Sequence, residues 1–428
     1  MDELQALRRA VDELGQWMQM RRDQGGGAAM DLRRLRRQVQ RATRQCQRER
    51  PSADVLAHEP NDLAGILRLR PPGPRRLWER LDTRLYSDKL KGAFLARAAG
   101  CTLGAIVEGS SVEHMENLAL HSGMAFPPRD YWTYTPFPWG TRYGMSRNSD
   151  YLRGQMTHLP VDDDLTYTLL GLLILEDYGP TFTTADVGKA WLAYLPMACT
   201  AEAVAMENLR KGMSWRRCGE VGNPYAEWIG ADIRSDAWGY VAPGRPEKAA
   251  ELAWRDAYIS HRRGGIYGAM YFAAAIAAAF AVDDPLEACR IALTEIPRRS
   301  RLSLALRWAL EQAPRIKDYR HARRLVDKKF PGMSPVHTVN NAACTIFGLA
   351  LGGTDVTAVL GNTVAIGLDN DCTAATAGSI VGAVVGAKGI AGHWYKPFRN
   401  RVRTYMTGKE WFTIPDILRR FARAAKAV

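Results

Sequence analysis

Residues 162–179 read DDDLTYTLLGLLILEDYG, and residues 369–386 read DNDCTAATAGSIVGAVVG. Each stretch begins with clustered aspartates and continues as an apolar run with helical spacing, so each predicts a helix with an acidic N-terminus. Asp is favoured at N-caps and in first turns, so capping alone explains either cluster taken singly. Two such clusters favour a shared cation site, because close carboxylates repel one another unless a cation or protons compensate them. Mg²⁺ and Mn²⁺ prefer such oxygen ligands.

The chain around these stretches predicts an all-α domain. From residue 161 onward, apolar runs with helical period dominate, strand-like alternation is scarce, and Pro and Gly separate the runs. The helix after Asp371 is rich in Ala and Gly, which allow another helix to approach closely. The most apolar stretches, 266–282 and 374–387, are shorter than the roughly 20 residues of a transmembrane span. We therefore expect buried helices and no membrane partner.

Residues 1–50 predict a helical hairpin or short coiled-coil arm. Two segments carry apolar residues at alternating spacings of three and four, and three glycines at 25–27 separate them. The second segment holds eight arginines, at 33, 34, 36, 37, 41, 44, 48 and 50. We expect this to be a solvated face rather than a nucleic-acid site, and we expect the apolar stripes to serve self-association or a protein partner. Residues 51–78 contain five prolines and predict a linker, followed by the globular domain at 79–428.

Composition indicates a globular protein of a reducing compartment. The 428 residues are 46% hydrophobic and 24% charged, which is ordinary for a globular chain. Seven scattered cysteines without a C-x-x-C pair argue against a disulfide framework or zinc ribbon, and the N-terminus lacks the apolar core of a signal peptide. We therefore expect a cytoplasmic protein. The net charge of +13 is compatible with an acidic partner and equally with an Arg-rich proteome.

Other chemical motifs are missing from the sequence. It has no P-loop, no G-x-S-x-G elbow, no H-E-x-x-H and no Rossmann fingerprint, which leaves the carboxylates to carry the chemistry. Residues 121–160 include the aromatic run FPPRDYWTYTPFPWGTRYG and predict either a lid over a site or a surface loop packed by its own aromatics. Residues 223–236, which include Glu227 and Arg234, are dense in polar and aromatic residues, and we expect them to line a substrate cleft.

Four stretches, taken in order, resemble the ADP-ribosylglycohydrolase family, which includes dinitrogenase-reductase-activating glycohydrolase. LARAAGCTLGAIVEG, with Gly104 and Glu108, resembles the end of the family's opening helix. Asp162-Asp163-Asp164 resembles its Thr-Asp-Asp motif, and Asp369-Asn370-Asp371-Cys372 resembles its Asp-x-Asp-Thr motif. Ser260-His261 resembles its Ser/Thr-His element before a Gly/Ala-rich helix. The resemblance covers roughly residues 86–400.

The resemblance implies a helical hydrolase that binds two Mg²⁺ or Mn²⁺ ions. The ligands it implies are Asp162, Asp163, Asp164, Asp369 and Asp371, with Cys372 at the position of a ligand. Glu108 would be a flexible acid beside the metals, and Glu108 and Asp163 would be catalytic. Ser260 and His261 would bind substrate, with His261 near its adenine or diphosphate end.

The sequence departs from the family pattern at three positions. Asp162 stands where Thr is frequent, Leu165 where a hydroxyl is common, and Cys372 where Thr is a ligand of the second metal. A neutral thiol is a poor ligand for Mg²⁺. The departure at Cys372 therefore bears on occupancy of the second metal position.

The function that we predict is metal-dependent cleavage of the N- or O-glycosidic bond of ADP-ribose attached to a protein. A second hypothesis is hydrolysis of a small N-glycoside or nucleoside-like metabolite, motivated by the aromatic segment at 121–160. A third is a binding or immunity protein whose N-terminal arm occludes an ADP-ribosylating partner, motivated by the Arg-rich segment and by Cys372.

Overall fold

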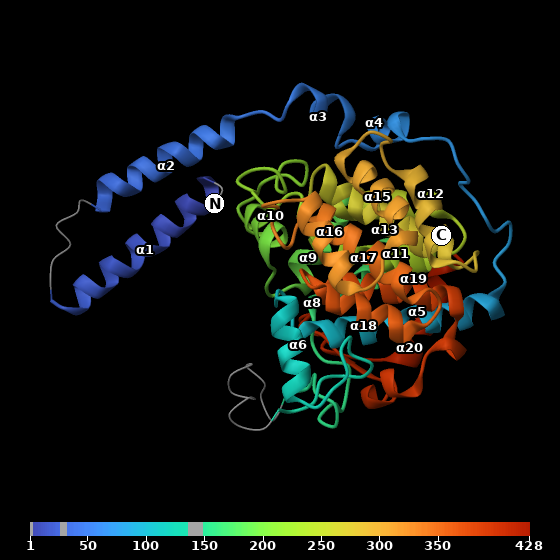
Figure 1. The fold of residues 1–428 in the computed structure, drawn as a ribbon. Helices are drawn as coiled ribbons and strands as arrows, with labels where there is room; N and C mark the ends of the chain where they lie inside the picture. The colour runs from blue at the N-terminus through green and yellow to red at the C-terminus, as the bar shows by residue number, and fades with distance from the viewer. Residues whose placement is uncertain (1–2, 26–31, 136–148) are drawn as a thin grey trace. The chain divides into compact units, whose positions relative to one another are not determined.

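The computed structural model describes residues 3–25, 32–135 and 149–428 (Figure 1). The chain divides into two compact units, Met1–Ala53 and Asp54–Val428. The first unit holds α1 (Glu3–Asp23) and α2 (Leu32–Arg48), the two helices that the apolar spacing predicts. On α1 the apolar side chains of Leu7, Val11 and Trp17 are exposed. Of the predicted apolar stripe, Leu7 and Val11 are therefore exposed, whereas Leu14 and Met18 are half-buried.

The Pro-rich segment after residue 53 belongs to the second unit. It forms α3 (Ala53–His58) and α4 (Leu63–Leu69) and then runs without regular structure to residue 82. Arg301 pairs with Glu59 at 2.8 Å, and Arg70 pairs with Glu295 at 2.6 Å. Because Glu59 and Glu295 are buried, these pairs attach the segment to the domain. The boundary between the two units thus lies at residues 53 and 54, within the predicted 51–78 linker and near its start.

The second unit is built mainly from helices, as the sequence predicts. In the described residues it also contains α6 (Val112–His121), α9 (Thr184–Tyr194), α10 (Thr200–Arg210), α11 (Ser235–Val241), α12 (Pro246–Ala257), α13 (Gly264–Ala279), α14 (Pro285–Ala292), α15 (Arg301–Gln312), α16 (Tyr319–Lys329), α17 (Thr338–Gly352), α18 (Val356–Ile366) and α20 (Ile414–Ala425). Short 3₁₀ turns lie at Ile229–Arg234, Leu293–Glu295, Ala313–Arg315, Ala387–Gly389, Gly392–Trp394 and Lys396–Phe398. In the described residues, the one sheet pairs β1 (Arg401–Arg403) with β2 (Trp411–Thr413) in antiparallel fashion.

The helices α5 (Thr83–Ala105), α8 (Asp163–Tyr178) and α19 (Asn370–Val385) position the acidic clusters. The α5 and α19 helices lie side by side (Figure 1). A Cβ atom on Gly100 would lie 2.2 Å from the carbonyl oxygen of Ala374, and one on Gly104 would lie 2.4 Å from the Cα of Asp371. Backbone therefore touches backbone, as the small residues of α19 predict, and the end of α5 lies against the first turn of α19.

The two most apolar stretches form helices inside the domain. All of α13 is buried, and so is α19 from Asn370 to Val384. No helix in the described part of the chain combines the length and apolar character that crossing a bilayer requires.

Candidate metal centre

Three chain segments far apart in sequence meet at a cavity of about 540 Å³. Glu108 comes from the turn after α5, Asp162 and Asp163 from the start of α8, and Asp369 and Asp371 from the start of α19. The cavity is also lined by Val161, Tyr167, Met197, Cys199, Thr200, Glu202, Trp228, Ile229, Gly230, Ile233, Val336, Cys372 and Tyr405. A volume of this size is typical of a small-molecule site.

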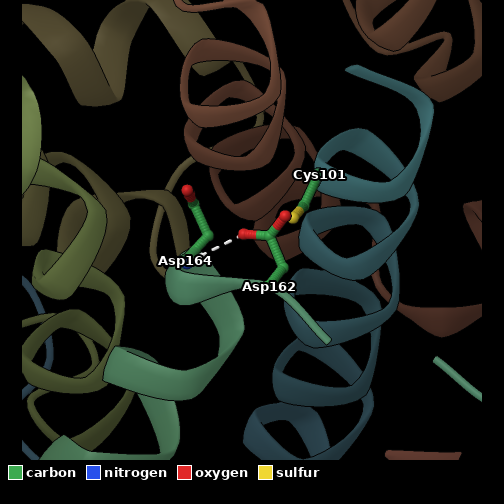
Figure 2. Close-up of side chains that lie close together, drawn as sticks. All are labelled: Cys101, Asp162 and Asp164. Carbon is green, nitrogen blue, oxygen red and sulfur yellow. Dashed lines mark hydrogen bonds between the residues drawn. The ribbon is translucent and has the colours of Figure 1, made fainter. Parts of the chain in front are cut away.

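The aspartates at the start of α8 have different surroundings. Asp162 is the N-cap of the helix, and its Oδ1 accepts a hydrogen bond from the backbone N–H of Asp164 at 2.9 Å (Figure 2). Asp163 lines the cavity. Asp164 is fully buried and does not line the cavity. Asp162 therefore caps α8 and also lines the acidic cavity, so the capping role and the site role are compatible.

Asp164 is held from behind by the buried side chain of Arg97, which lies on α5. The Arg97 Nη2 lies 3.2 Å from Asp164 Oδ1, and its Nη1 lies 2.7 Å from Asp236 Oδ2. The other Asp164 oxygen accepts a hydrogen bond from the Cys372 thiol at 3.3 Å. Arg97 thus supplies positive charge behind the acidic cluster and fixes the orientation of the Asp164 carboxylate.

The aspartates at the start of α19 have unsatisfied oxygens. Asp369 occupies the N-cap position but makes no capping hydrogen bond with its side chain. Oδ1 of Asp369 and Oδ1 of Asp371 have no hydrogen-bond partner among the described residues, although the two residues are only 5% and 4% exposed. Leaving buried acceptors unpaired costs free energy. A cation between these oxygens would remove that cost.

The raised pKa values of the clustered carboxyl groups also show that their negative charges need a compensating cation or protons. Burial raises the pKa of Asp162, Asp164 and Asp369 well above the usual aspartate value, and neighbouring carboxylates add to the effect. The charge of Asp371, followed by burial, raises the pKa of Glu108 to about 7. Carboxylates that resist ionisation together are those that a divalent cation stabilises.

Ligand atoms in the cluster also fall within reach of single ions. Three groups have ligand atoms that all lie within 4.8 Å of one another: Cys101 with Asp162 and Asp164, Asp164 with Asp371 and Cys372, and Glu108 with Asp369 and Asp371. The residues present therefore fit divalent cations.

The residues that were predicted to contact substrate lie behind the cavity wall. Arg234 donates hydrogen bonds to Glu202 and to Asp256, each at 2.7 Å, and to Ser260 Oγ at 3.2 Å. Ser260 Oγ in turn lies 2.8 Å from His261 Nδ1. All five side chains are buried, and of these Glu202 alone lines the cavity. The structure thus brings Arg234, Ser260 and His261 together in a network that supports the wall through Glu202.

Glu227 is likewise outside the cavity lining, and it pairs with Arg301 at 2.7 Å. The stretch around it does reach the cavity, because Trp228, Ile229 and Gly230 line the wall. The predicted cleft stretch 223–236 therefore contributes through neighbours of Glu227 rather than through its carboxylate.

The described part of the aromatic segment at 121–160 packs into the domain. The Trp132 indole donates to the Leu103 carbonyl at 3.0 Å, and the Tyr131 hydroxyl donates to the Trp394 carbonyl at 2.6 Å. Both side chains are buried. Residues 136–148 lie outside the described residues, and the lid hypothesis for 121–160 stays a prediction.

Several residues at or beside the cavity carry no sequence motif. Tyr167, Tyr405 and Glu202 line the wall, and Cys101 lies behind it, facing Asp162 (Figure 2). Tyr167 lies near the start of α8, within an apolar run. In the sequence it is therefore indistinguishable from the core residues around it. Burial raises the pKa of Glu202 to about 7.

The fold and the cavity together define a helical protein with a carboxylate-rich pocket suited to divalent cations. A family model described as ADP-ribosylglycohydrolase matches residues 82–425, and the chain belongs to this family of glycohydrolases. The resemblance seen in the sequence is thereby confirmed.

One solved structure, described as an ADP-ribosylglycohydrolase-related protein complex, aligns with 80% of this chain and 98% of that chain at 20% identity and a TM-score of 0.49. The search of curated proteins gave no match.

Proposed function

We propose that this chain hydrolyses the N- or O-glycosidic bond that joins ADP-ribose to a protein. The observation that carries the proposal is the convergence of Glu108, Asp163 and Asp371 on one cavity, which Asp369 also lines. The buried Oδ1 atoms of Asp369 and Asp371 have no hydrogen-bond partner among the described residues. Family membership supports a glycohydrolase, and the cavity volume suits part or all of a nucleotide-like group.

Asp162, Asp163, Asp369 and Asp371 would hold the cations, with Mg²⁺ or Mn²⁺ the ions that such oxygens suit. When bound, divalent cations supply Lewis acidity and lower the pKa of bound water. Arg97 keeps Asp164 oriented and offsets part of the negative charge when the cations are absent.

Glu108 is the residue that we assign to proton transfer. Its side chain is exposed, and in the metal-free protein its pKa is about 7, so it can hold or release a proton near neutral pH. A placed carboxyl group of this kind contributes about 10²–10⁴-fold to a rate. Trp228, Tyr167 and Tyr405 offer aromatic surface on the cavity wall for orienting a planar or sugar ring.

The test is incubation with arginine- and serine-linked ADP-ribosylated proteins and with free ADP-ribosyl compounds, with and without Mg²⁺ or Mn²⁺. We expect cation-dependent release of ADP-ribose from modified protein, reduced about 10²-fold or more in Glu108→Gln. Glu207→Gln is the matched control, because Glu207 is an exposed helix residue paired with Lys211 away from the cavity. Cleavage of free metabolites without release from protein would instead support the small N-glycoside hypothesis.

A further inference from the structure

Two cysteine thiols accompany the acidic cluster, and both are buried. The Cys372 Sγ donates to Asp164 Oδ2 at 3.3 Å. The Cys101 Sγ lies within 4.8 Å of carboxylate oxygens of both Asp162 and Asp164, and Figure 2 shows it directed at the Asp162 carboxylate from the α5 helix. Two thiols, one from α5 and one from α19, therefore lie near the Asp164 carboxylate.

The three groups of ligand atoms differ in their chemistry. Glu108, Asp369 and Asp371 offer oxygen alone. The other two groups each include one sulfur, and they share Asp164. Hard cations such as Mg²⁺ prefer oxygen ligands, whereas thiolate ligands select Zn²⁺ and related ions. The same cavity thus offers an oxygen-only cation position and positions that include a sulfur ligand.

The geometry at Cys372 matches a sulfur and an oxygen that bind one ion. With Zn–S near 2.3 Å and Zn–O near 2.1 Å, a tetrahedral angle separates the two ligand atoms by about 3.6 Å. The observed separation is 3.3 Å. The thiol proton now lies between these atoms. If a cation replaced it, the proton would pass to solvent and both atoms would become ligands without a large movement.

A second observation points to a ligand at the same place. Asp371 belongs to this group, and its buried Oδ1 has no hydrogen-bond partner among the described residues. Cys372 and Asp371 both line the cavity, so an ion can reach them from solvent. Asp164, the third member of this group, does not line the cavity and also belongs to the group that contains Cys101.

We propose that the cavity holds two chemically distinct cation positions. Asp369 and Asp371, two of the cation ligands of the proposed function, form an oxygen-only position for Mg²⁺ or Mn²⁺ beside Glu108. Asp164, Asp371 and Cys372 form a sulfur-containing position for Zn²⁺, with Cys101 adjoining it through Asp164. This inference rests on the proposed function only in using the same acidic cavity.

The test uses the full-length protein under reducing conditions and needs no substrate. Substitution with Co²⁺ should give a thiolate-to-cobalt charge-transfer absorption band. Loading with Zn²⁺ followed by dialysis against excess Mg²⁺ should leave one Zn²⁺ per chain by elemental analysis. In Cys372→Ser the band should disappear and Zn²⁺ binding should weaken by about 100-fold or more, since even changes outside the ligand shell cost about 10–100-fold.

Cys199→Ser is the matched control. Cys199 also lines the cavity but belongs to none of the three ligand groups, so its loss should leave the band and the Zn²⁺ content unchanged. Cys372→Thr, checked for folding by circular dichroism, replaces Cys372→Ser if that variant does not fold. A wild-type Co²⁺ complex without the band would overturn the proposal, as would a band that survives in the Cys372 variants or is lost in Cys199→Ser.

The outcome is separable from that of the proposed function. Bound Zn²⁺ with a thiolate signature, but no release of ADP-ribose from any substrate, would refute the proposed function alone. Release of ADP-ribose with Mg²⁺, but no thiolate signature, would refute this inference alone.

Discussion

Single side chains decide what the cavity can bind. We expect Asp163→Asn and Asp371→Asn each to weaken Mg²⁺ or Mn²⁺ binding by about 10-fold or more, because each removes a charged oxygen ligand. Isothermal titration calorimetry on the wild type and both variants measures the change. Glu207→Gln, away from the cavity, should bind as the wild type does. If both aspartate variants retain wild-type affinity, these residues do not hold the cation.

Cys372 decides how well its position accepts a hard ion. We expect Cys372→Thr to raise the affinity for Mg²⁺, because a hydroxyl oxygen suits a hard cation better than a neutral thiol. Mg²⁺ titrations of the two proteins test this, with Cys199→Ser as the control. An unchanged Mg²⁺ affinity would mean that residue 372 does not contact this ion.

The acidic members of the site could be named from the sequence, and the rest could not. Clustered aspartates ahead of apolar runs carry both a charge signal and a helix signal. Reactive polar groups also occur in Ser260, His261 and Arg234. The sequence does not show whether these side chains face the cavity, and in the structure they are buried behind its wall. Cys101 stands in a run of small and apolar residues and becomes visible only when α8 brings Asp162 beside it.

At the scale of helices, the sequence predicts where a helix lies better than it predicts which other helix packs against it. The starts of α8 and α19 were predictable from their aspartates, and the small residues of α19 predicted a close neighbour. That the neighbour is α5 follows from tertiary packing, because helical periodicity marks a face and not what covers it. The pairing matters because it carries Glu108 to the first turn of α19.

Gly104 is the residue of α5 that packs directly against Asp371, at the start of α19. A Cβ on Gly104 would lie 2.4 Å from the Cα of Asp371, and backbone cannot yield as a flexible side chain can. We expect Gly104→Ala to lower the free energy of unfolding by about 1–3 kcal/mol and to weaken Mg²⁺ binding by displacing Asp371. Chemical denaturation and calorimetry measure both effects.

Gly15→Ala is the control for that substitution. Gly15 lies within α1, and a Cβ atom on it would meet no other atom within 4 Å, so alanine should leave stability unchanged or slightly higher. A Gly104→Ala protein with wild-type stability and wild-type Mg²⁺ affinity would contradict the close approach.

For the whole molecule, the acidic cluster makes stability depend on pH. In the metal-free folded protein the pKa of Glu108 rises from 4.5 to about 7, so the folded state keeps a proton that the unfolded chain has lost. Stability falls with pH where the unfolded state binds fewer protons. The contribution of Glu108 to the free energy of unfolding should therefore decline as pH rises from about 4.5 through about 7.

Thermal or urea unfolding across this pH range measures the effect in the metal-free protein. Subtracting the pH profile of Glu108→Gln isolates the glutamate from other titrating groups. Mg²⁺ should shrink the decline, because a bound cation stabilises the ionised carboxylates. A wild-type profile that rises relative to Glu108→Gln over this range would reverse the sign and contradict the assignment.

The chain divides into two compact units between residues 53 and 54. Residues 1–53 expose Leu7, Val11 and Trp17 on α1, and α2 adds a strongly basic surface. Exposed apolar stripes favour association with another surface, and a basic face should make association with an acidic partner fall as salt rises. We expect a protein that starts at Asp54 to fold and bind Mg²⁺ as the full chain does, while its self-association or partner affinity decreases.

A second truncation, starting at Pro71, is the matched comparison for that experiment. It removes the Glu59–Arg301 and Arg70–Glu295 pairs, which join the Pro-rich segment to the domain through buried carboxylates. Leaving Glu295 with one of its two arginine partners should lower stability, because a buried charge that loses a partner is costly. Thermal unfolding and sedimentation of the two truncated proteins distinguish the roles of the segments. Aggregation or loss of Mg²⁺ binding in the protein starting at Asp54 would place residues 1–53 within the folded core and refute the division.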